Sequence, residues 1–397
     1  MNLETLKTRI QDNVDSVSKE LIGLSYRIHA NPEVSYKEEK ASKWLADYLE
    51  EKGFKVERGA ADLPTAFVAS YGKNKPAIAF LAEYDALPEI GHGCGHNIIG
   101  TAAAGAGIAA KLIADELGAK IMVIGCPGEE LLGGKAFMVE KGIFDEVDAA
   151  LEMHPMAVPE NWAGAKMTAS SLLDVQFWGK PSHAAFDPWN GVSALAAMIQ
   201  SFVHIDSLRL HIKDRSRIAG VITDGGKAPN VIPEHSAGRF LIRTAQDGDL
   251  DDLREKVIKC FEAAAISTGC QLEYHLGPRC NAMQNNSVLL ELWRSNMAAL
   301  GRQVGEMNIN SGSTDVGNVS VITPSIHPFL SISEETLPGH SAQFAAAAVS
   351  KAGDKAVLDG AKALAMTAAD IAAQLETLAR AKEELKETRK RERIFYA

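Results

Sequence analysis

Side chains that bind metal ions follow three apolar segments of this sequence. Each segment has the length and composition of a buried parallel strand, and open α/β sheets bind their ligands at the carboxyl ends of such strands. A thiol, imidazoles and carboxylates gathered there are typical donors of a catalytic metal site. The side chains are Cys94 and His96 after residues 77–82, Glu129 and Glu130 after residues 120–126, and His154 after residues 148–153.

Neighbouring residues in this set are expected to have different roles. Cys94 and His96 are one residue apart and can point into one pocket from an extended turn, and Glu130 and His154 are the obvious ligands from the next two strands. Glu129 would point differently from Glu130, which suits a general base that is not committed to the metal. A last imidazole can come from His340, within Pro338–Ser341.

Three further polar residues near the first strand receive smaller roles. Glu83 and His92 are interpreted as loop residues, and Asp85 as a supporting carboxylate at most. Taken alone, the predicted ligands also have ordinary interpretations: a buried core cysteine, a histidine in a glycine-rich turn, and an acidic pair at a helix start. Their convergence on three strand ends favours the metal site.

Composition excludes several classes of protein. The 397 residues suggest two domains, and a net charge of -10 argues against a nucleic-acid partner. We expect no membrane partner, since no apolar run reaches the length of a span. The first residues lack the pattern of a signal peptide. Five scattered cysteines fit a reducing cytoplasm better than a disulfide framework.

The pattern of elements predicts an α/β fold with an inserted domain. Residues 1–167 and 281–397 are expected to form one discontinuous domain with helices around a sheet, starting with a long amphipathic helix over residues 2–29. Residues 35–38 (Ser-Tyr-Lys-Glu) have the form of a capping box that starts the next helix. Residues 168–280 follow the order β-α-β-β-α-β, which is a ferredoxin-like domain.

The motifs occur in the order of a known family. The sequence resembles the aminoacylase/carboxypeptidase family of metal-dependent amidohydrolases, in the cysteine-ligand branch that includes p-aminobenzoyl-glutamate hydrolase and the β-alanyl and Xaa-Arg dipeptidases. The resemblance implies a zinc-peptidase-like catalytic domain with a mixed central sheet, and an inserted ferredoxin-like domain that mediates homodimerisation. The motifs lie at residues 82–88 (Ala-Glu-Tyr-Asp-Ala-Leu-Pro), 93–96 (Gly-Cys-Gly-His), 127–130 (Pro-Gly-Glu-Glu), 153–155 (Met-His-Pro), 313–317 (Ser-Thr-Asp-Val-Gly) and 339–341 (Gly-His-Ser).

The resemblance also implies a division of labour among residues. It assigns the metal, one or two ions of Mn or Zn per subunit, to Cys94, His96, Glu130, His154 and His340, and the acid/base role to Glu129. His183 matches a histidine that reaches the partner's active site and polarises the scissile carbonyl. Asn230 and Arg243 match groups that hold the substrate's carboxylate, a task for which the planar guanidinium suits Arg243.

We therefore expect a cytoplasmic, homodimeric hydrolase of amide bonds in N-acyl amino acids or dipeptide-like small molecules. The alternative is a non-catalytic dimeric protein of the same fold that binds a metal and a carboxylate ligand. Retention of Glu129 argues for the enzyme, because a binding protein needs no base. The sequence leaves open the acyl group of the substrate, the metal and the role of Asp315.

Overall fold

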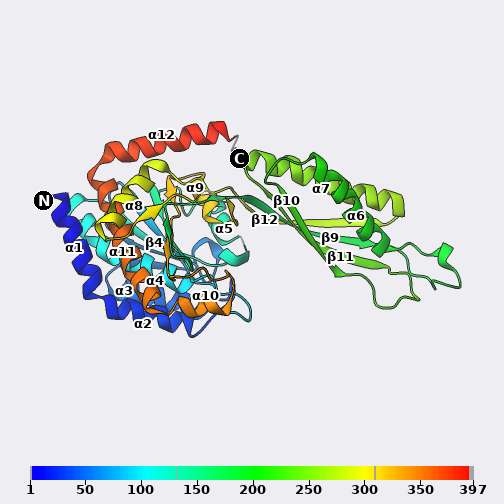
Figure 1. Cartoon of the computed structure of the whole chain (residues 1–397), viewed down its shortest axis with the longest axis horizontal. Coiled ribbons are helices and arrows are strands. Elements are labelled where there is room, and N and C mark those ends of the chain that lie inside the picture. Colours follow the sequence, from blue (N-terminus) through cyan, green and yellow to red (C-terminus); the bar gives the residue numbers. More distant parts are fainter. Residues whose placement is uncertain (1, 132, 308–309, 393–397) are drawn as a thin grey trace. The chain divides into compact units, whose positions relative to one another are not determined.

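The computed structural model describes residues 2–131, 133–307 and 310–392 (Figure 1). These residues form two compact units, each described here by itself. Unit 1 comprises the chain up to residue 166 together with residues 283–391, and unit 2 comprises residues 167–282.

A six-stranded sheet forms the centre of unit 1. In the spatial order given below, the last four strands run parallel to one another, and they are apolar because both of their faces are covered. The second strand runs antiparallel to the first and to the third. The mixed central sheet that the sequence predicts is therefore confirmed. In spatial order the strands are β1 (Lys55–Arg58), β2 (Phe67–Tyr71), β4 (Lys120–Cys126), β3 (Ala77–Glu83), β5 (Ala149–Leu151) and β15 (Ser325–Ile326).

Helix α4 (His96–Leu117) is the central helix of unit 1 and packs directly on this sheet. It comes close because glycines face the strands: a Cβ at Gly107 would lie 2.3 Å from the Val123 side chain, and one at Gly100 would lie 2.7 Å from the Glu83 carbonyl. By length and composition α4 would pass as a membrane span, but 83% of its most apolar window is buried inside the protein. This burial is that of a core helix.

The other helices of unit 1 pack around α4 and the sheet, with α11 directly against α4. They are α1 (Leu3–Ser16), α2 (Ser18–His29), α3 (Glu39–Glu51), α5 (Gly134–Glu140), α8 (Ser287–Ala299), α9 (Val316–Ser320), α10 (Ala342–Ala347), α11 (Lys351–Ala373) and α12 (Leu375–Arg391), with the 3-10 turns η1 (Ala60–Asp62) and η2 (Glu129–Leu131).

Two local predictions near the N-terminus are wrong. The helix expected over residues 2–29 is divided at Val17, whose ψ of 11° is not helical. The capping box at residues 35–38 does not form: the Ser35 hydroxyl donates to Asp85 Oδ2 at 2.7 Å, and the N-cap of α3 has no side-chain hydrogen bond. The side chains that would cap the helix instead form hydrogen bonds with residues distant in the sequence.

Two strands of unit 1 pass from the central sheet into a second, smaller sheet. After β5 the chain continues as β6 (His154–Met156), and after β15 it continues as β16 (Phe329–Ser331); β5 pairs with β15, and β6 pairs with β16. The second sheet also contains β7 (Asn161–Trp162) and β13 (Val304–Gly305), and β8 (Lys166–Met167) pairs with β14 (Asn310–Ser311). The single strand expected over residues 148–153 therefore ends early, and His154 begins a new strand.

Unit 2 has the predicted β-α-β-β-α-β order and an antiparallel sheet. The spatial order β10-β11-β9-β12 is that of a ferredoxin-like domain, and apolar side chains from the sheet and both helices form its own core. Its elements are β9 (Ala169–Trp178), η3 (Pro188–Asn190), α6 (Ala194–Leu208), η4 (Arg209–His211), β10 (Arg217–Asp224), β11 (His235–Thr244), α7 (Asp247–Thr268) and β12 (Gln271–Cys280).

Candidate metal centre

Unit 1 brings all five predicted metal ligands into one cluster. The donor atoms of Cys94, His96 and His154 lie within 4.8 Å of one another, and so do those of Cys94, Glu130 and His340. The Cys94 thiol lies 3.5 Å from His154 Nε2, and His96 Nε2 lies 3.9 Å from Glu130 Oε1. The two groups share Cys94, so the cluster is continuous.

Hydrogen bonds orient the two buried imidazoles towards this cluster. His96 Nδ1 lies 2.8 Å from Asp85 Oδ1, and His154 Nδ1 lies 2.7 Å from the Pro155 carbonyl. A ring nitrogen that donates to an oxygen leaves the other nitrogen as the acceptor, so Nε2 of each ring is the atom available to a metal ion. Burial, followed by the nearby His327, lowers the pKa of His154 to about 3, which keeps this ring neutral.

The donor set fits a cation. His96 Nε2, Glu83 Oε2 and Glu130 Oε1 are buried, and each lacks a hydrogen-bond partner among the described residues. Burial lowers the pKa of His96, but the charges of Asp85 and Glu83 outweigh it and raise that pKa well above its usual value. The surrounding carboxylates thus stabilise a positive charge at this point, and a divalent ion would supply it.

Glu129 borders the cluster as an almost fully buried carboxyl group, with 7% of its surface exposed. Its Oε2 lies 3.9 Å from His96 Nε2, and Glu83, His96 and Glu129 form a third group of donors within 4.8 Å. Burial and the charge of Glu83 raise the pKa of Glu129 well above its usual range. A carboxyl group with a raised pKa, next to a metal-binding cluster, is suited to take up and release a proton.

His340 forms the solvent side of the cluster. Its side chain is 57% exposed, its Nε2 lies 3.6 Å from Glu130 Oε2, and its backbone has a φ of +52°. The backbone amide of His340 donates to the Gly93 carbonyl at 3.2 Å, which attaches this loop to the turn that carries Cys94. The cluster is therefore buried on one side and open on the other, as a catalytic site requires.

The interpretation of Glu83 as a loop residue is wrong. Glu83 is the last residue of β3 and fully buried, with Oε2 3.4 Å from His96 Nε2. Its other oxygen forms an ion pair with Lys135, a fully buried lysine at the start of α5. Sequence reasoning did not identify Lys135, because nothing in the local pattern of α5 distinguishes it from a surface lysine.

Lys135 is the centre of a buried charged group behind the cluster. Its ammonium lies 2.6 Å from Asp315 Oδ1 and 3.9 Å from Glu152 Oε2, and Glu152 Oε1 lies 3.2 Å from His327 Nε2. Glu152 lies between β5 and β6, and His327 lies between β15 and β16, where the chain passes from one sheet to the other. His327 packs against His154 with ring centroids 5.5 Å apart. The motif at residues 313–317 thus contributes Asp315 as an ion-pair partner of Lys135.

The loop before α3 supports the turn that carries Glu129. The buried carboxylate of Glu38 accepts hydrogen bonds from Gly128 N at 2.9 Å, from Tyr36 N at 2.7 Å and from the Thr65 hydroxyl at 3.0 Å. The Tyr36 ring covers Gly128 so closely that a Cβ there would lie 2.6 Å from it. The glycine before Glu129 is therefore required by packing.

Glu38 makes folding stability depend on pH in a way that a substitution can isolate. Burial raises its pKa to about 7, so the folded chain binds more protons than the unfolded chain between about pH 4.5 and 7. Stability is therefore lost as pH rises through this window. The free energy of unfolding of the Glu38→Gln variant lacks this dependence on pH. Relative to the original chain, it should therefore be on the order of 3 kcal/mol more favourable at pH 8 than at pH 4. Urea unfolding at both pH values measures it, with exposed Glu39→Gln as the control; an equal difference at both pH values would contradict it.

The predicted residues of unit 2 lie at two ends of its sheet. His183 pairs with Val231, and the Ala184 amide donates to the Asn230 carbonyl at 3.0 Å, so His183 and Asn230 occupy adjoining loops. Arg243 lies near the far end of β11, opposite Ser170. The strand between the two ends spans roughly 25 Å. Within one subunit, Arg243 is thus distant from Asn230.

The fold and the cluster define a two-unit metallohydrolase, and comparison with known proteins gives its family. The model of Peptidase family M20/M25/M40 matches residues 79–370. The chain belongs to this family, which confirms the resemblance inferred from its motifs.

Relatives of known activity share much of the sequence. Xaa-Arg dipeptidase of Mus musculus is 36% identical over 394 residues, covering 93% of this chain and 89% of that protein. One of the subunits of p-aminobenzoyl-glutamate hydrolase from Escherichia coli (strain K12) is 36% identical over 304 residues, covering 70% of this chain and 62% of that protein.

Solved structures share the fold at lower identity. The aminobenzoyl-glutamate utilization protein of Klebsiella pneumoniae superposes with a TM-score of 0.74 at 18% identity, over 91% of this chain and 98% of that one. The YXEP protein of Bacillus subtilis, described as a dinuclear metal binding peptidase, has a TM-score of 0.67 at 21% identity. The superposition covers 90% of this chain and 99% of that one.

Proposed function

We propose that this protein is a metal-dependent hydrolase that cleaves the amide bond of N-acyl amino acids or dipeptide-like substrates. The observation that carries the proposal is the position of Glu129, a buried carboxyl group beside a cluster of thiol, imidazole and carboxylate donors. Two relatives, a dipeptidase and an aminobenzoyl-glutamate hydrolase, cleave bonds of this type by their names.

Two ions of Zn or Mn per subunit are the proposed cofactor. Cys94 belongs to two donor groups, one with His96 and His154 and one with Glu130 and His340, and these two groups together would hold two ions. The thiolate favours a softer, zinc-like metal. When bound, the metal would polarise the attacking water and the scissile carbonyl.

The residues of this chain then have defined tasks. Glu129 takes the proton of the attacking water and delivers it to the leaving amine, which its position and raised pKa permit. Asp85 holds the His96 ring in its ligand orientation. His183 stabilises the oxyanion, and Asn230 and Arg243 hold the carboxylate of the leaving amino acid.

A homodimer would bring the two ends of the unit 2 sheet to one substrate. His183 and Asn230 would come from one subunit and Arg243 from the other, since one subunit holds them far apart. Unit 2 offers a surface for such contact: β10 is an edge strand with Val221 57% exposed, and α6 exposes Ile199 and Val203 by about half. We further propose a cytoplasmic location, consistent with the free thiols of Cys126 and Cys260.

A hydrolysis screen tests the proposed function. Protein loaded with Zn or with Mn is expected to cleave part of a panel of N-acyl amino acids and dipeptides, and a chelator is expected to abolish turnover, with recovery on adding the metal back. Elemental analysis should find two ions per chain. Metal-loaded protein that binds a panel member tightly and hydrolyses none would instead identify a carboxylate-binding protein.

A further inference from the structure

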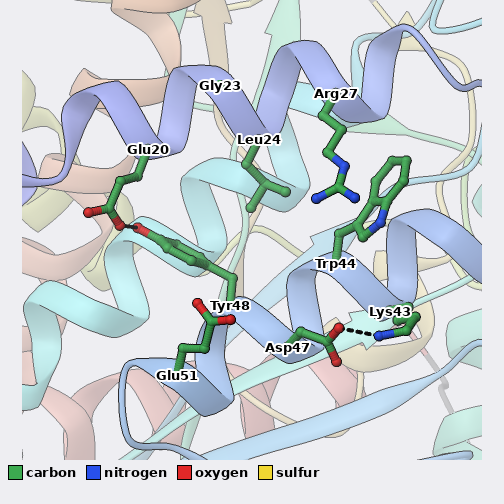
Figure 2. A pocket seen from close by; sticks show the side chains of 9 residues that line it. All are labelled: Glu20, Gly23, Leu24, Arg27, Lys43, Trp44, Asp47, Tyr48 and Glu51. Atoms are coloured by element: carbon green, nitrogen blue, oxygen red, sulfur yellow. Dashed lines mark hydrogen bonds and ion pairs between the residues drawn. The ribbon is translucent and has the colours of Figure 1, made fainter.

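A groove lies between α2 and α3 on the surface of unit 1, and none of its lining residues belongs to the metal-binding cluster (Figure 2). Its volume of about 580 Å³ is within the range of small-molecule sites. Leu24 and the rings of Trp44 and Tyr48 provide apolar surface, and charged side chains of both helices surround it.

One residue of this groove is not explained by packing within the chain. Gly23 lies inside α2, where glycine lowers helix stability relative to alanine. A Cβ at Gly23 would meet no atom within 4 Å, unlike Gly100 and Gly107 of α4, which neighbouring strands require. The absent side chain leaves space in the groove instead, and an occupant of the groove would account for it.

Two charged side chains of the groove have no ion pair among the described residues, whereas Glu20 pairs with Lys52 and Asp47 with Lys43. The unpaired ones are Arg27, whose guanidinium lies 4.0 Å from the centroid of the Trp44 ring, and Glu51. A guanidinium placed over an aromatic ring keeps its N–H donors available to a carboxylate.

The two unpaired charges lie at opposite sides of the groove (Figure 2). Arg27 contacts Trp44, and Trp44 and Glu51 are two helical turns apart on α3, so the charges are separated by roughly 10 Å along the helix. The apolar surface of Leu24 and Tyr48 lies between them. A ligand that meets both charges must carry its own opposite charges at its two ends.

We propose that this groove binds a linear zwitterion, of the class of ω-amino acids and extended dipeptides. Its carboxylate pairs with Arg27, its ammonium pairs with Glu51, and its apolar middle lies on Leu24 and Tyr48 above Gly23. Ordinary α-amino acids do not satisfy both ends, because their two charges are on one carbon. The site is separate from the metal centre and holds its ligand without hydrolysing it.

Calorimetric titration of the metal-loaded full chain with ε-aminocaproate tests this proposal, because this probe has both charges and no amide bond. We expect one site per chain with a dissociation constant on the order of 1 mM. Caproate and n-hexylamine, which each lack one charge, should bind at least about tenfold more weakly, and so should ε-aminocaproate to the Arg27→Gln and Glu51→Gln variants. The Glu50→Gln variant, altered at a residue outside the groove, should bind like the original chain.

The Gly23→Leu variant provides the decisive comparison. It fills the groove with a strong helix former and should abolish binding while leaving the fold and hydrolytic activity unchanged. Gly23→Ala, the matched control, should raise the melting temperature and retain binding. Equal binding to the original chain and to Gly23→Leu would overturn the proposal, as would the absence of saturable heat with the original chain. A groove covered by a second copy would also overturn it, and gel filtration would then show a smaller assembly for Gly23→Leu than for the original chain.

Discussion

The Glu129→Gln variant is expected to lose hydrolytic activity by about 10²–10⁴-fold in kcat while it binds the same amount of metal. Glutamine keeps the size and polarity of the side chain but cannot accept a proton from water. Glu129 is buried and lies outside the two donor groups that share Cys94, so its change should leave those donors in place. The measurement is steady-state kinetics on a substrate found in the screen, together with elemental analysis of the purified variant.

The neighbouring residue provides the control for this result. Glu130 belongs to the donor group of Cys94 and His340, so Glu130→Gln should lower metal content as well as activity. If Glu129→Gln hydrolyses substrate at an undiminished rate, the proton must move through another group and the proposed mechanism is wrong. If both variants lose metal equally, Glu129 is itself a metal ligand, and the assignment of Glu129 as the base and Glu130 as the ligand is wrong.

The Lys135→Met variant is expected to have the largest effect on stability. Methionine has nearly the same length, but it leaves the buried carboxylates of Glu83 and Asp315 without the ammonium that compensates them. Removing one partner from a buried ion pair costs about 3–5 kcal/mol, because the remaining charge stays desolvated. Urea unfolding measures this loss.

Two further variants separate charge from packing at this position. Lys141→Met removes a half-exposed lysine just after α5 that pairs with Asp62, and it should change stability by less than about 1 kcal/mol. The double variant Lys135→Met with Asp315→Asn should recover part of the lost stability, since one uncompensated charge is then gone. A single Lys135→Met variant as stable as the original chain would show that the buried carboxylates are protonated and need no cation.

The clustering of the candidate metal ligands was predictable because local sequence determines where apolar strands end. The buried strands β3 and β4 and the ferredoxin-like order of unit 2 follow from composition and periodicity, and family motifs add His340. The charged group around Lys135 was not predictable in this way. Lys135 and Asp315 are 180 residues apart, and no periodic pattern links them.

The capping box failed for the same physical reason. Residues 35–38 have the right residue types for a helix start, but Asp85 and Gly128 offer buried partners to Ser35 and Glu38. The start of α3 also keeps a partner, because the Glu33 carboxylate accepts hydrogen bonds from first-turn amides, at 2.9 Å from Lys40 N and 3.0 Å from Ala41 N. Tertiary hydrogen bonding therefore overrides the local signal where the chain supports the site.

The discontinuity of unit 1 has a consequence for the order in which the newly made chain matures. Residues 167–282 are contiguous and have their own core, so unit 2 can fold as soon as they leave the ribosome. The core of unit 1 cannot be completed until α11 has been synthesised, because α11 lies near the end of the chain and packs on α4. His340 also emerges late, after every other predicted ligand. The metal-binding cluster is thus completed late, and a chain truncated before residue 340 would carry a folded insert and an incomplete cluster.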